Sequence, residues 1–398
     1  MSAATTIPRS ANLKQLKNQA KDLLRALRKG EPDVVQEFAE IHPRPISAES
    51  AKLTDAQLVL ARRYGFDSWP KLRLEVAGAQ LRRAIWDKNS SGITETLDSE
   101  PDTLLQPGAH PVFGGRPTPL QIAAERGQTD TVSLLLDRGA DINTPGEYGW
   151  TPLQLAAHWE HTEVARLLLD RGAKMDIFTA CLLGDTATVD RLLTETPTLA
   201  TTAGLNDAPP LHVATNPEIA RVLLDKGASL DTVDSQGNTP LGSAISRGSH
   251  LVALLLLEKG ASADACQLAA LGEKDRLVEL LESDASAISF KGRIGLNAVI
   301  GTPLHAAAQA GQVEVAQLLL ERGADPNARA DSGQTPLHNC ASQEIAELLI
   351  DAAADTNALD DEYGTTPLAW AKQTIRNQGH SSTRAELVTY LEQVTPSS

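Results

Sequence analysis

The chain has 398 residues and a formal net charge of −15, with 41% apolar but only 4% aromatic residues. This length exceeds what one compact core usually supports, so several domains or an extended array are expected. Residues 1–80 hold 13 basic and 9 acidic side chains, whereas residues 81–398 hold 23 basic and 42 acidic ones. Because such an acidic surface repels phosphate backbones, nucleic acid is excluded as an expected partner.

The cysteines and the apolar runs indicate a cytoplasmic protein. Cys181, Cys266 and Cys340 lie far apart within helical patterns, which favours a reducing compartment and core thiols over disulfides or nucleophiles. The N-terminus has no apolar signal core, and no stretch approaches the roughly 20 apolar residues that span a bilayer. We therefore expect a cytoplasmic monomer without membrane contact.

Residues 1–80 are predicted to form a small helical domain. The expected helices are one from residue 13 that Gly30 ends, one over residues 32–41, one opened by residues 53–57, and one after the turn at 64–70. Thr54 is expected to cap the third helix. The first helix carries a basic face but no aromatic anchor, so we interpret that face as solvated surface on a capping domain.

The clearest repeating unit is TPLHAAAQAGQVEVAQLLLERGADPNA, residues 302–328. Thr302 is expected to cap a short helix with Pro303 at its first position, because a proline there loses no hydrogen bond. Gly311 ends this helix, and the apolar residues that follow recur at the spacing of a second helix, with Gly323 suited to its C-cap. Neither helix can bury its apolar face alone, so each unit needs a neighbour on both sides.

This unit resembles the ankyrin repeat. The residues that carry the resemblance are Thr302-Pro303-Leu304-His305-Ala306-Ala307, Leu318-Leu319-Leu320 and Gly323-Ala324-Asp325. Residues 56–72 are similar to a helical segment found ahead of ankyrin repeats in bacterial proteins. The resemblance implies an all-α solenoid of about ten helix-turn-helix units that binds a partner. It also implies that His212, His305 and His338 brace neighbouring turns.

Prolines of Thr-Pro-Leu or of its relics mark the array. They stand at positions 119, 152, 210, 240, 303, 336 and 367. Most intervals are 30 to 33 residues, but two are 58 and 63, and each hides a degenerate unit, at residues 176–199 and 264–288. A third degenerate unit begins at residue 81. Because positions 119, 210 and 303 are 91 and 93 residues apart, three blocks of about 92 residues are predicted. The expected domains are a helical cap (1–80), the repeat array (81–380) and a C-terminal capping helix with its tail (381–398).

Long connections follow the degenerate units, at residues 106–117, 201–208 and 286–301. Insertions at one repeat position project from one side of a solenoid, so these loops are expected to share a face and to be candidates for function. Two other units are shortened: the stretches that begin at His212 and His338 lack three residues of the first helix or its turn.

Aromatic and imidazole side chains gather in one repeat. Tyr148 and Trp150 stand at its turn, and His158 and Trp159 at the end of its first helix. In the ankyrin family these positions commonly touch partners, so the resemblance implies a partner-binding site here. The alternative is that Trp150 packs over Pro152 while Trp159 shields the helix turn.

Catalytic and metal sites are not predicted. His158, Glu160 and His161 have the side chains of metal ligands, but three donors within four residues at a helix end rarely converge on one ion. The sequence has no phosphate-binding glycine-rich loop, no nucleophile elbow and no paired-carboxylate pattern, so no cofactor is expected.

The sequence therefore predicts a non-catalytic scaffold that displays a concave acidic groove to a protein partner with a basic segment. The alternative is a small-molecule-binding or enzymatic protein whose pocket is formed by the three long loops. The candidate residues for that pocket are His110, Asn206, Asp207, Lys291 and Arg293. A third possibility is that the basic N-terminal domain covers the groove of its own chain.

Overall fold

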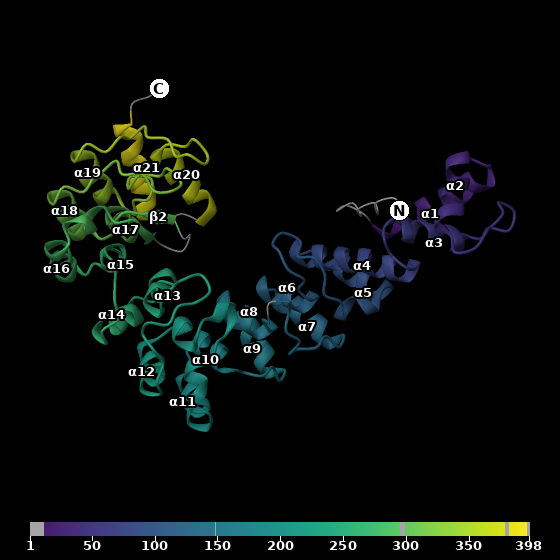
Figure 1. The fold of residues 1–398 in the computed structure, drawn as a ribbon, viewed down its shortest axis with the longest axis horizontal. Coiled ribbons are helices and arrows are strands. Elements are labelled where there is room, and N and C mark those ends of the chain that lie inside the picture. The colour runs from purple at the N-terminus through teal and green to yellow at the C-terminus, as the bar shows by residue number, and fades with distance from the viewer. Residues whose placement is uncertain (1–11, 148, 295–298, 379–381, 396–398) are drawn as a thin grey trace. The chain divides into compact units, whose positions relative to one another are not determined.

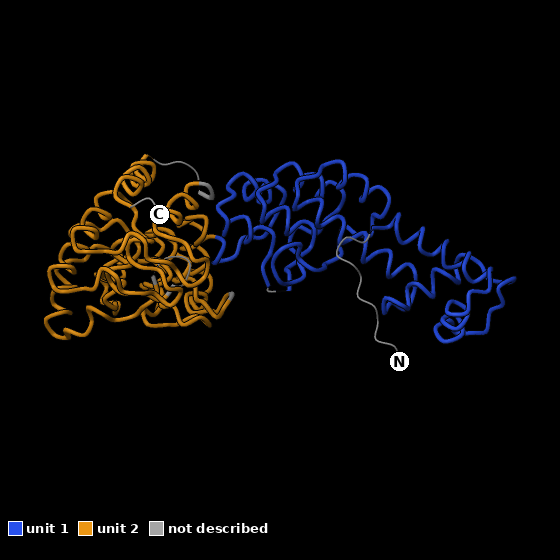
Figure 2. Tube along the Cα trace, turned by 90° about the horizontal axis from the view of Figure 1, so that it is seen from above, with its two compact units in different colours: residues 1–179 blue, residues 180–398 orange. Residues whose placement is uncertain are grey.

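The computed structural model describes residues 12–147, 149–294, 299–378 and 382–395, and these are predominantly helical (Figure 1). The chain divides into two compact units, residues 1–179 and 180–398 (Figure 2). The predicted all-α repeat architecture is confirmed, because short helices follow one another in pairs from α4 to α21.

Unit 1 begins with four helices that enclose a core of their own. They are α1 (Leu13–Arg28), α2 (Pro32–Ile41), α3 (Leu53–Arg63) and α4 (Trp69–Trp86). The buried residues of α1, which are Leu16, Ala20, Leu23 and Leu27, lie in this core together with residues of α3 and α4. The cap predicted at Thr54 is wrong. Because α3 already starts at Leu53, Thr54 lies inside its first turn, and the carboxylate of Asp55 instead accepts a hydrogen bond from the N–H of Lys52 at 2.8 Å.

The same unit continues into the first repeats. Their elements are α5 (Ser90–Ser99), the 3-10 turn η1 (Pro101–Leu105), α6 (Pro119–Glu125), α7 (Thr129–Asp137), α8 (Pro152–His158) and α9 (Thr162–Asp170). Helix α4 passes through the boundary predicted at residue 80, and its second half packs on α5 and α6. Thr118 and Thr151 cap α6 and α8, as the Thr-Pro-Leu motif predicts. Helix α6 packs on α7 and α8, and α8 on α9, which buries the slim alanine-rich faces between them.

Unit 2 carries the remaining repeats. After α10 (Ile177–Leu183), which spans the unit boundary, the elements are α11 (Thr186–Glu195), η2 (Pro197–Thr201), η3 (Leu205–Asp207), η4 (Pro210–Val213), α12 (Pro217–Asp225), α13 (Pro240–Ser246), α14 (His250–Glu258), α15 (Ala265–Leu271), α16 (Lys274–Ser283), η5 (Ala285–Ser289), β1 (Gly292–Ile294), β2 (Val299–Gly301), α17 (Pro303–Ala310), α18 (Val313–Glu321), α19 (Gln343–Asp351), α20 (Pro367–Gln378) and α21 (Ser382–Val394). The last helix, α21, lies within the C-terminal segment 381–398 that was expected to contain a capping helix.

The long connections have more local structure than the sequence indicated. Each degenerate unit ends in a 3-10 turn, namely η1, η2 and η5, which is a further likeness among the three blocks. The third connection also contains a two-stranded antiparallel hairpin, in which Gly292 pairs with Gly301. The predicted shortening of two units is confirmed. Their first helix is reduced to the 3-10 turn η4 in one unit and to turns over residues 336–339 in the other.

A left-handed residue joins the two helices of most units. Glycine fills this position at Gly127, Gly184, Gly248, Gly272 and Gly311, each with a φ between 63° and 77°. Lys88 and Glu160 are the exceptions, with φ values of 57° on the turn between α4 and α5 and 58° on the turn between α8 and α9. A residue with a side chain is strained in this backbone region, so these two turns cost conformational free energy that the turns with glycine avoid.

Candidate functional site

A pocket of about 240 Å³ lies in unit 1 between the loop 106–117 and the repeat that contains α8. It combines one loop predicted as functional with the aromatic cluster predicted to bind a partner. We call it the aromatic pocket, and its lining residues are His110, Phe113, Gly114, Gly115, Arg116, Pro117, Gln121, Glu125, Gly146, Glu147, Trp150, Leu155, His158 and Trp159.

Arg82 of α4 holds the loop 106–117 in place through hydrogen bonds to its backbone. Its side chain is only 1% exposed, and it donates hydrogen bonds to the carbonyl oxygens of Gln106 and Ala109, each at 3.3 Å. Burial lowers the pKa of this guanidinium, against the opposing effect of Glu75 at 3.8 Å. A Cβ atom on Gly108 would overlap the guanidinium, so glycine is needed there for close approach. The loop is thus tied to the repeat stack through a buried charge.

His110 shapes the pocket wall. Its Nδ1 accepts hydrogen bonds from the backbone N–H groups of Val112 (3.1 Å) and Phe113 (2.8 Å), so the ring proton resides on Nε2. That Nε2–H group donates to Oε2 of Glu125 at 3.2 Å. The imidazole therefore acts as a neutral bracket that joins the loop to the end of α6, and it is not placed as a free base.

Aromatic contacts complete this side of the site. The Trp86 ring meets the rings of His110 and Phe113 edge-on, with centroids 5.0 and 5.7 Å apart. The Arg126 guanidinium lies 4.3 Å from the centroid of the Trp86 ring, within the range of cation–π attraction. Sequence reasoning missed Trp86, Phe113 and Arg126, because they stand on three different elements that only the fold brings together.

The repeat that contains α8 contributes the predicted partner-binding residues Trp150, His158 and Trp159 to the lining. The His158 ring stands edge-on between Trp150 and Trp159, with centroid distances of 4.8 and 5.2 Å. Trp159 is 51% exposed, whereas Trp150 is half-buried, and its carbonyl accepts a hydrogen bond from Gln121 at 2.7 Å. Tyr148, the fourth predicted residue, lies outside the described residues.

The other residues predicted for a ligand pocket lie in unit 2. Asn206, Asp207, Lys291 and Arg293 are all exposed. The carbonyl of Asn206 accepts a hydrogen bond from the N–H of Ser235 at 2.6 Å. Arg293 donates to Oδ1 of Asn238 at 3.0 Å. The second and third long loops therefore both contact one repeat turn, residues 234–238, and only His110 lines the aromatic pocket.

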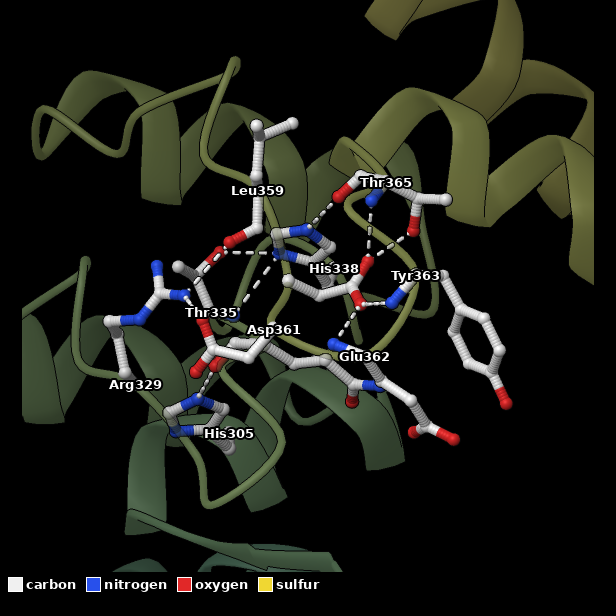
Figure 3. A network of polar contacts seen from close by, with 11 residues as sticks. His305, Arg329, Thr335, His338, Leu359, Asp361, Glu362, Tyr363 and Thr365 are labelled. Carbon is white, nitrogen blue, oxygen red and sulfur yellow. Dashed lines mark hydrogen bonds and ion pairs between the residues drawn. The ribbon is translucent and has the colours of Figure 1, made fainter.

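The motif histidines have the bracing role that the resemblance implied. In Figure 3, His338 bridges its own unit and the next: Nδ1 accepts from the N–H of Thr335 at 3.1 Å, and Nε2 donates to the carbonyl of Thr365 at 3.0 Å. His305 and His212 make the matching Nε2 bonds to the carbonyls of Gln334 and Asn238. Burial lowers the pKa of all three, that of His305 to about 4.

Acidic residues stabilise the turn tips next to these histidines. Asp361 forms an ion pair with Arg329 at 2.7 Å (Figure 3). Burial alone would raise the pKa of Asp360, but hydrogen bonds from the hydroxyl of Thr365 and from three backbone N–H groups lower it to about 2. The many acidic turn residues thus serve the fold locally, as Asp residues in turns commonly do.

The three cysteines are buried and lie outside disulfides, as predicted. Burial raises the pKa of Cys266 and of Cys340 to about 12, which keeps both thiols protonated and unreactive. Within the described ranges, no three His, Cys, Asp or Glu side chains are grouped so as to hold a metal ion. No helix in the described part of the chain is both long and apolar enough to cross a membrane.

Comparisons with known proteins agree with the repeat architecture. The chain is 37% identical over 99 residues to the 2-5A-dependent ribonuclease of Mus musculus and 29% identical over 120 residues to Rabankyrin-5 of Homo sapiens. It is 34% identical over 122 residues to a putative ankyrin repeat-containing protein of Treponema pallidum (strain Nichols). These matches cover 25%, 30% and 31% of this chain and 12%, 9% and 31% of those proteins, respectively.

The family profile described as ankyrin repeats (3 copies) matches residues 81–179, 177–267 and 304–391. These ranges include more than half of the chain, and they cover most of the helix pairs from α4 to α21, although α16 lies outside them. The chain therefore belongs to the ankyrin-repeat family.

Proposed function

We propose that this protein is a non-catalytic scaffold that binds a protein partner at the aromatic pocket and the surface around it. Ankyrin repeats are generally protein-interaction modules, so the scaffold role follows from the family. The observation that supports this particular location is the exposure of two large rings in the lining of one pocket. Phe113 is 59% exposed and Trp159 is 51% exposed. Exposed aromatic side chains on a rigid support are typical anchors of protein interfaces.

The charge of the array favours a basic segment in the partner. Residues 81–398 carry a formal charge of −19, from 23 basic and 42 acidic side chains. A surface of this sign attracts cationic chains and speeds their association. The proposal therefore keeps the acidic repeat surface as the partner-binding face. The three buried thiols support a protein that works in a reducing compartment such as the cytoplasm, and the proposal keeps the expectation of a monomer.

The small-molecule alternative has less support. Loop 106–117 lines a pocket, but the four candidate residues of the other two loops are exposed, and two of them, Asn206 and Arg293, contact a repeat turn. His110 lacks the free Nδ1 that a general base in this position would need, since that atom already accepts two backbone N–H groups.

The proposal is tested by affinity capture from a lysate of the source cell. The intact chain is compared with the double variant Trp150→Ala/Trp159→Ala and with Tyr363→Ala, a control that removes an aromatic side chain that is 66% exposed in unit 2. We expect a partner that the intact chain and the control retain and that the double variant loses, and the purified partner should show the same order of affinity. Equal retention by all three chains would exclude the aromatic pocket as the interface.

A further inference from the structure

We propose that the aromatic pocket receives a single cationic side chain, a guanidinium or an ammonium group, from the partner. This inference rests on the proposed function and specifies the chemistry of the contact. Three observations support it: the burial and hydrogen bonding of the Glu125 carboxylate, the aromatic rings that line the same pocket, and the charges of the remaining lining residues.

Glu125 is a largely buried carboxylate, and no Lys or Arg side chain forms an ion pair with it among the described residues. Its side chain is 13% exposed, and among the described residues its only hydrogen-bond partner is His110, which contacts Oε2. His110 is the neutral Nε2–H tautomer, because its Nδ1 accepts two backbone N–H groups. It therefore donates one hydrogen bond without contributing a positive charge. Buried carboxylates are normally paired with a cation, so this one has room for a positively charged partner.

The walls of the pocket suit the rest of such a side chain. The rings of Phe113, Trp150 and Trp159 and the side chain of Leu155 line it. Cations bind to the faces of aromatic rings, and tryptophan gives the strongest attraction. Arginine and lysine also have apolar stems that pack against such rings while their charged ends reach a carboxylate. The pocket thus offers a favourable contact to both parts of a cationic side chain.

The charges at the rim agree with this assignment. Glu147 is a second carboxylate in the lining, whereas Arg116 is the one guanidinium there. Arg116 is exposed and donates to the carbonyl of Pro107 at 3.4 Å, so it is engaged by the loop itself. Arg126 is engaged by the Trp86 ring. Over residues 81–179 there are 9 basic and 14 acidic side chains, a net charge of −5 that disfavours an anion in this pocket.

The test uses three small probes on the full chain: the Nα-acetyl amides of arginine, lysine and citrulline. Citrulline has nearly the shape of arginine but no charge. Binding is followed through the indole N–H signals of Trp150 and Trp159 in NMR titrations up to about 50 mM probe, a range that detects weak anchors. We expect the arginine or the lysine probe to shift both signals, and citrulline to bind at least about tenfold more weakly.

Variants of the chain test whether the charge of Glu125 is responsible for binding the cationic probes. In Glu125→Gln the amide oxygen can still accept the hydrogen bond from His110, so the wall is kept while its charge is removed. We expect this variant to bind the cationic probes at least about tenfold more weakly. Glu95→Gln is the matched control, because Glu95 is exposed on α5 and does not line the pocket. Trp159→Ala serves as a second variant, since truncating a half-exposed side chain leaves the core intact.

The outcomes separate this inference from the proposed function. Equal binding of citrulline, unchanged binding by Glu125→Gln, or no shift with any probe would overturn the cationic assignment. If a captured partner still depended on Trp150 and Trp159, the scaffold proposal would stand without the cationic anchor. If the cationic probes bound as expected but no partner depended on these rings, the pocket would remain a cation receptor and the scaffold proposal would fail.

Discussion

Replacing His305 with glutamine tests whether the buried histidine brace makes the fold sensitive to acid. Glutamine is a suitable replacement because it occupies the same motif position in unit 1. Gln121 accepts from the N–H of Thr118 at 2.7 Å and donates to the carbonyl of Trp150 at 2.7 Å. His305 makes the same pair of contacts, with the N–H of Thr302 at 3.2 Å and the carbonyl of Gln334 at 3.0 Å.

The size of the expected change in unfolding free energy follows from the pKa of His305. This pKa is 6.5 in a solvated chain and about 4 in the fold, because burial disfavours the charged ring. Between these values the unfolded chain binds more protons than the folded chain. The free energy of unfolding therefore falls as the pH falls through this range. At pH 5 the loss from this one group is about 2 kcal/mol, and below pH 4 it reaches about 3 kcal/mol.

Urea unfolding measured at pH 7.5 and at pH 5 provides the assay. His305→Gln should be within about 1 kcal/mol of the wild type at pH 7.5, since its contacts are replaced. Between the two pH values it should lose about 2 kcal/mol less than the wild type. His250→Gln removes an exposed histidine and should leave the pH dependence unchanged. If His305→Gln had the same pH dependence as the wild type, the brace would not be the acid-sensitive group and the reasoning would be refuted.

Four further substitutions test three other features of the fold by urea unfolding. Gly108→Ala should destabilise unit 1 by about 2 kcal/mol, because the new Cβ displaces the buried Arg82 guanidinium; an unchanged midpoint would contradict that close approach. Glu160→Gly should stabilise the same unit by about 1 kcal/mol by removing a strained left-handed residue, and Ala353→Gly, at a φ of 69°, should do the same in unit 2; a loss of stability in both would refute the strain. Asp360→Asn should cost about 1 to 2 kcal/mol at pH 7, because an amide cannot accept all the hydrogen bonds that the carboxylate accepts, and similar midpoints for the two proteins would rule this out.

The repeat units could be predicted because their signals are local. Thr302 and Pro303 mark a helix start, Gly311 marks its end, and both follow from backbone preferences of single residues. The shortened units at His212 and His338 were also readable, since a three-residue deletion from a two-turn helix leaves too little chain for an α-helix. The 3-10 turns and the hairpin of the long connections gave no comparable signal.

The aromatic pocket shows where sequence reasoning stops. Trp150 and Trp159 were found because they stand close together in a chain that has few aromatic residues. Glu125 and Phe113 were missed, since they are neighbours only after the buried Arg82 has fixed the path of the loop. A contact between side chains on three elements depends on the path of the loop, and the spacing of residues in the sequence does not predict that path.

The fourth position of the Thr-Pro-Leu-His motif, which braces neighbouring turns, is occupied differently in the two units, and this difference matters for stability in acid. Unit 1 fills this position with Gln121 and Gln154, which do not titrate, whereas His212, His305 and His338 all belong to unit 2. Mild acid should therefore loosen the second unit while the first keeps its braces. A protease that is active at low pH would digest unit 2 first and leave a resistant N-terminal fragment that still contains the aromatic pocket.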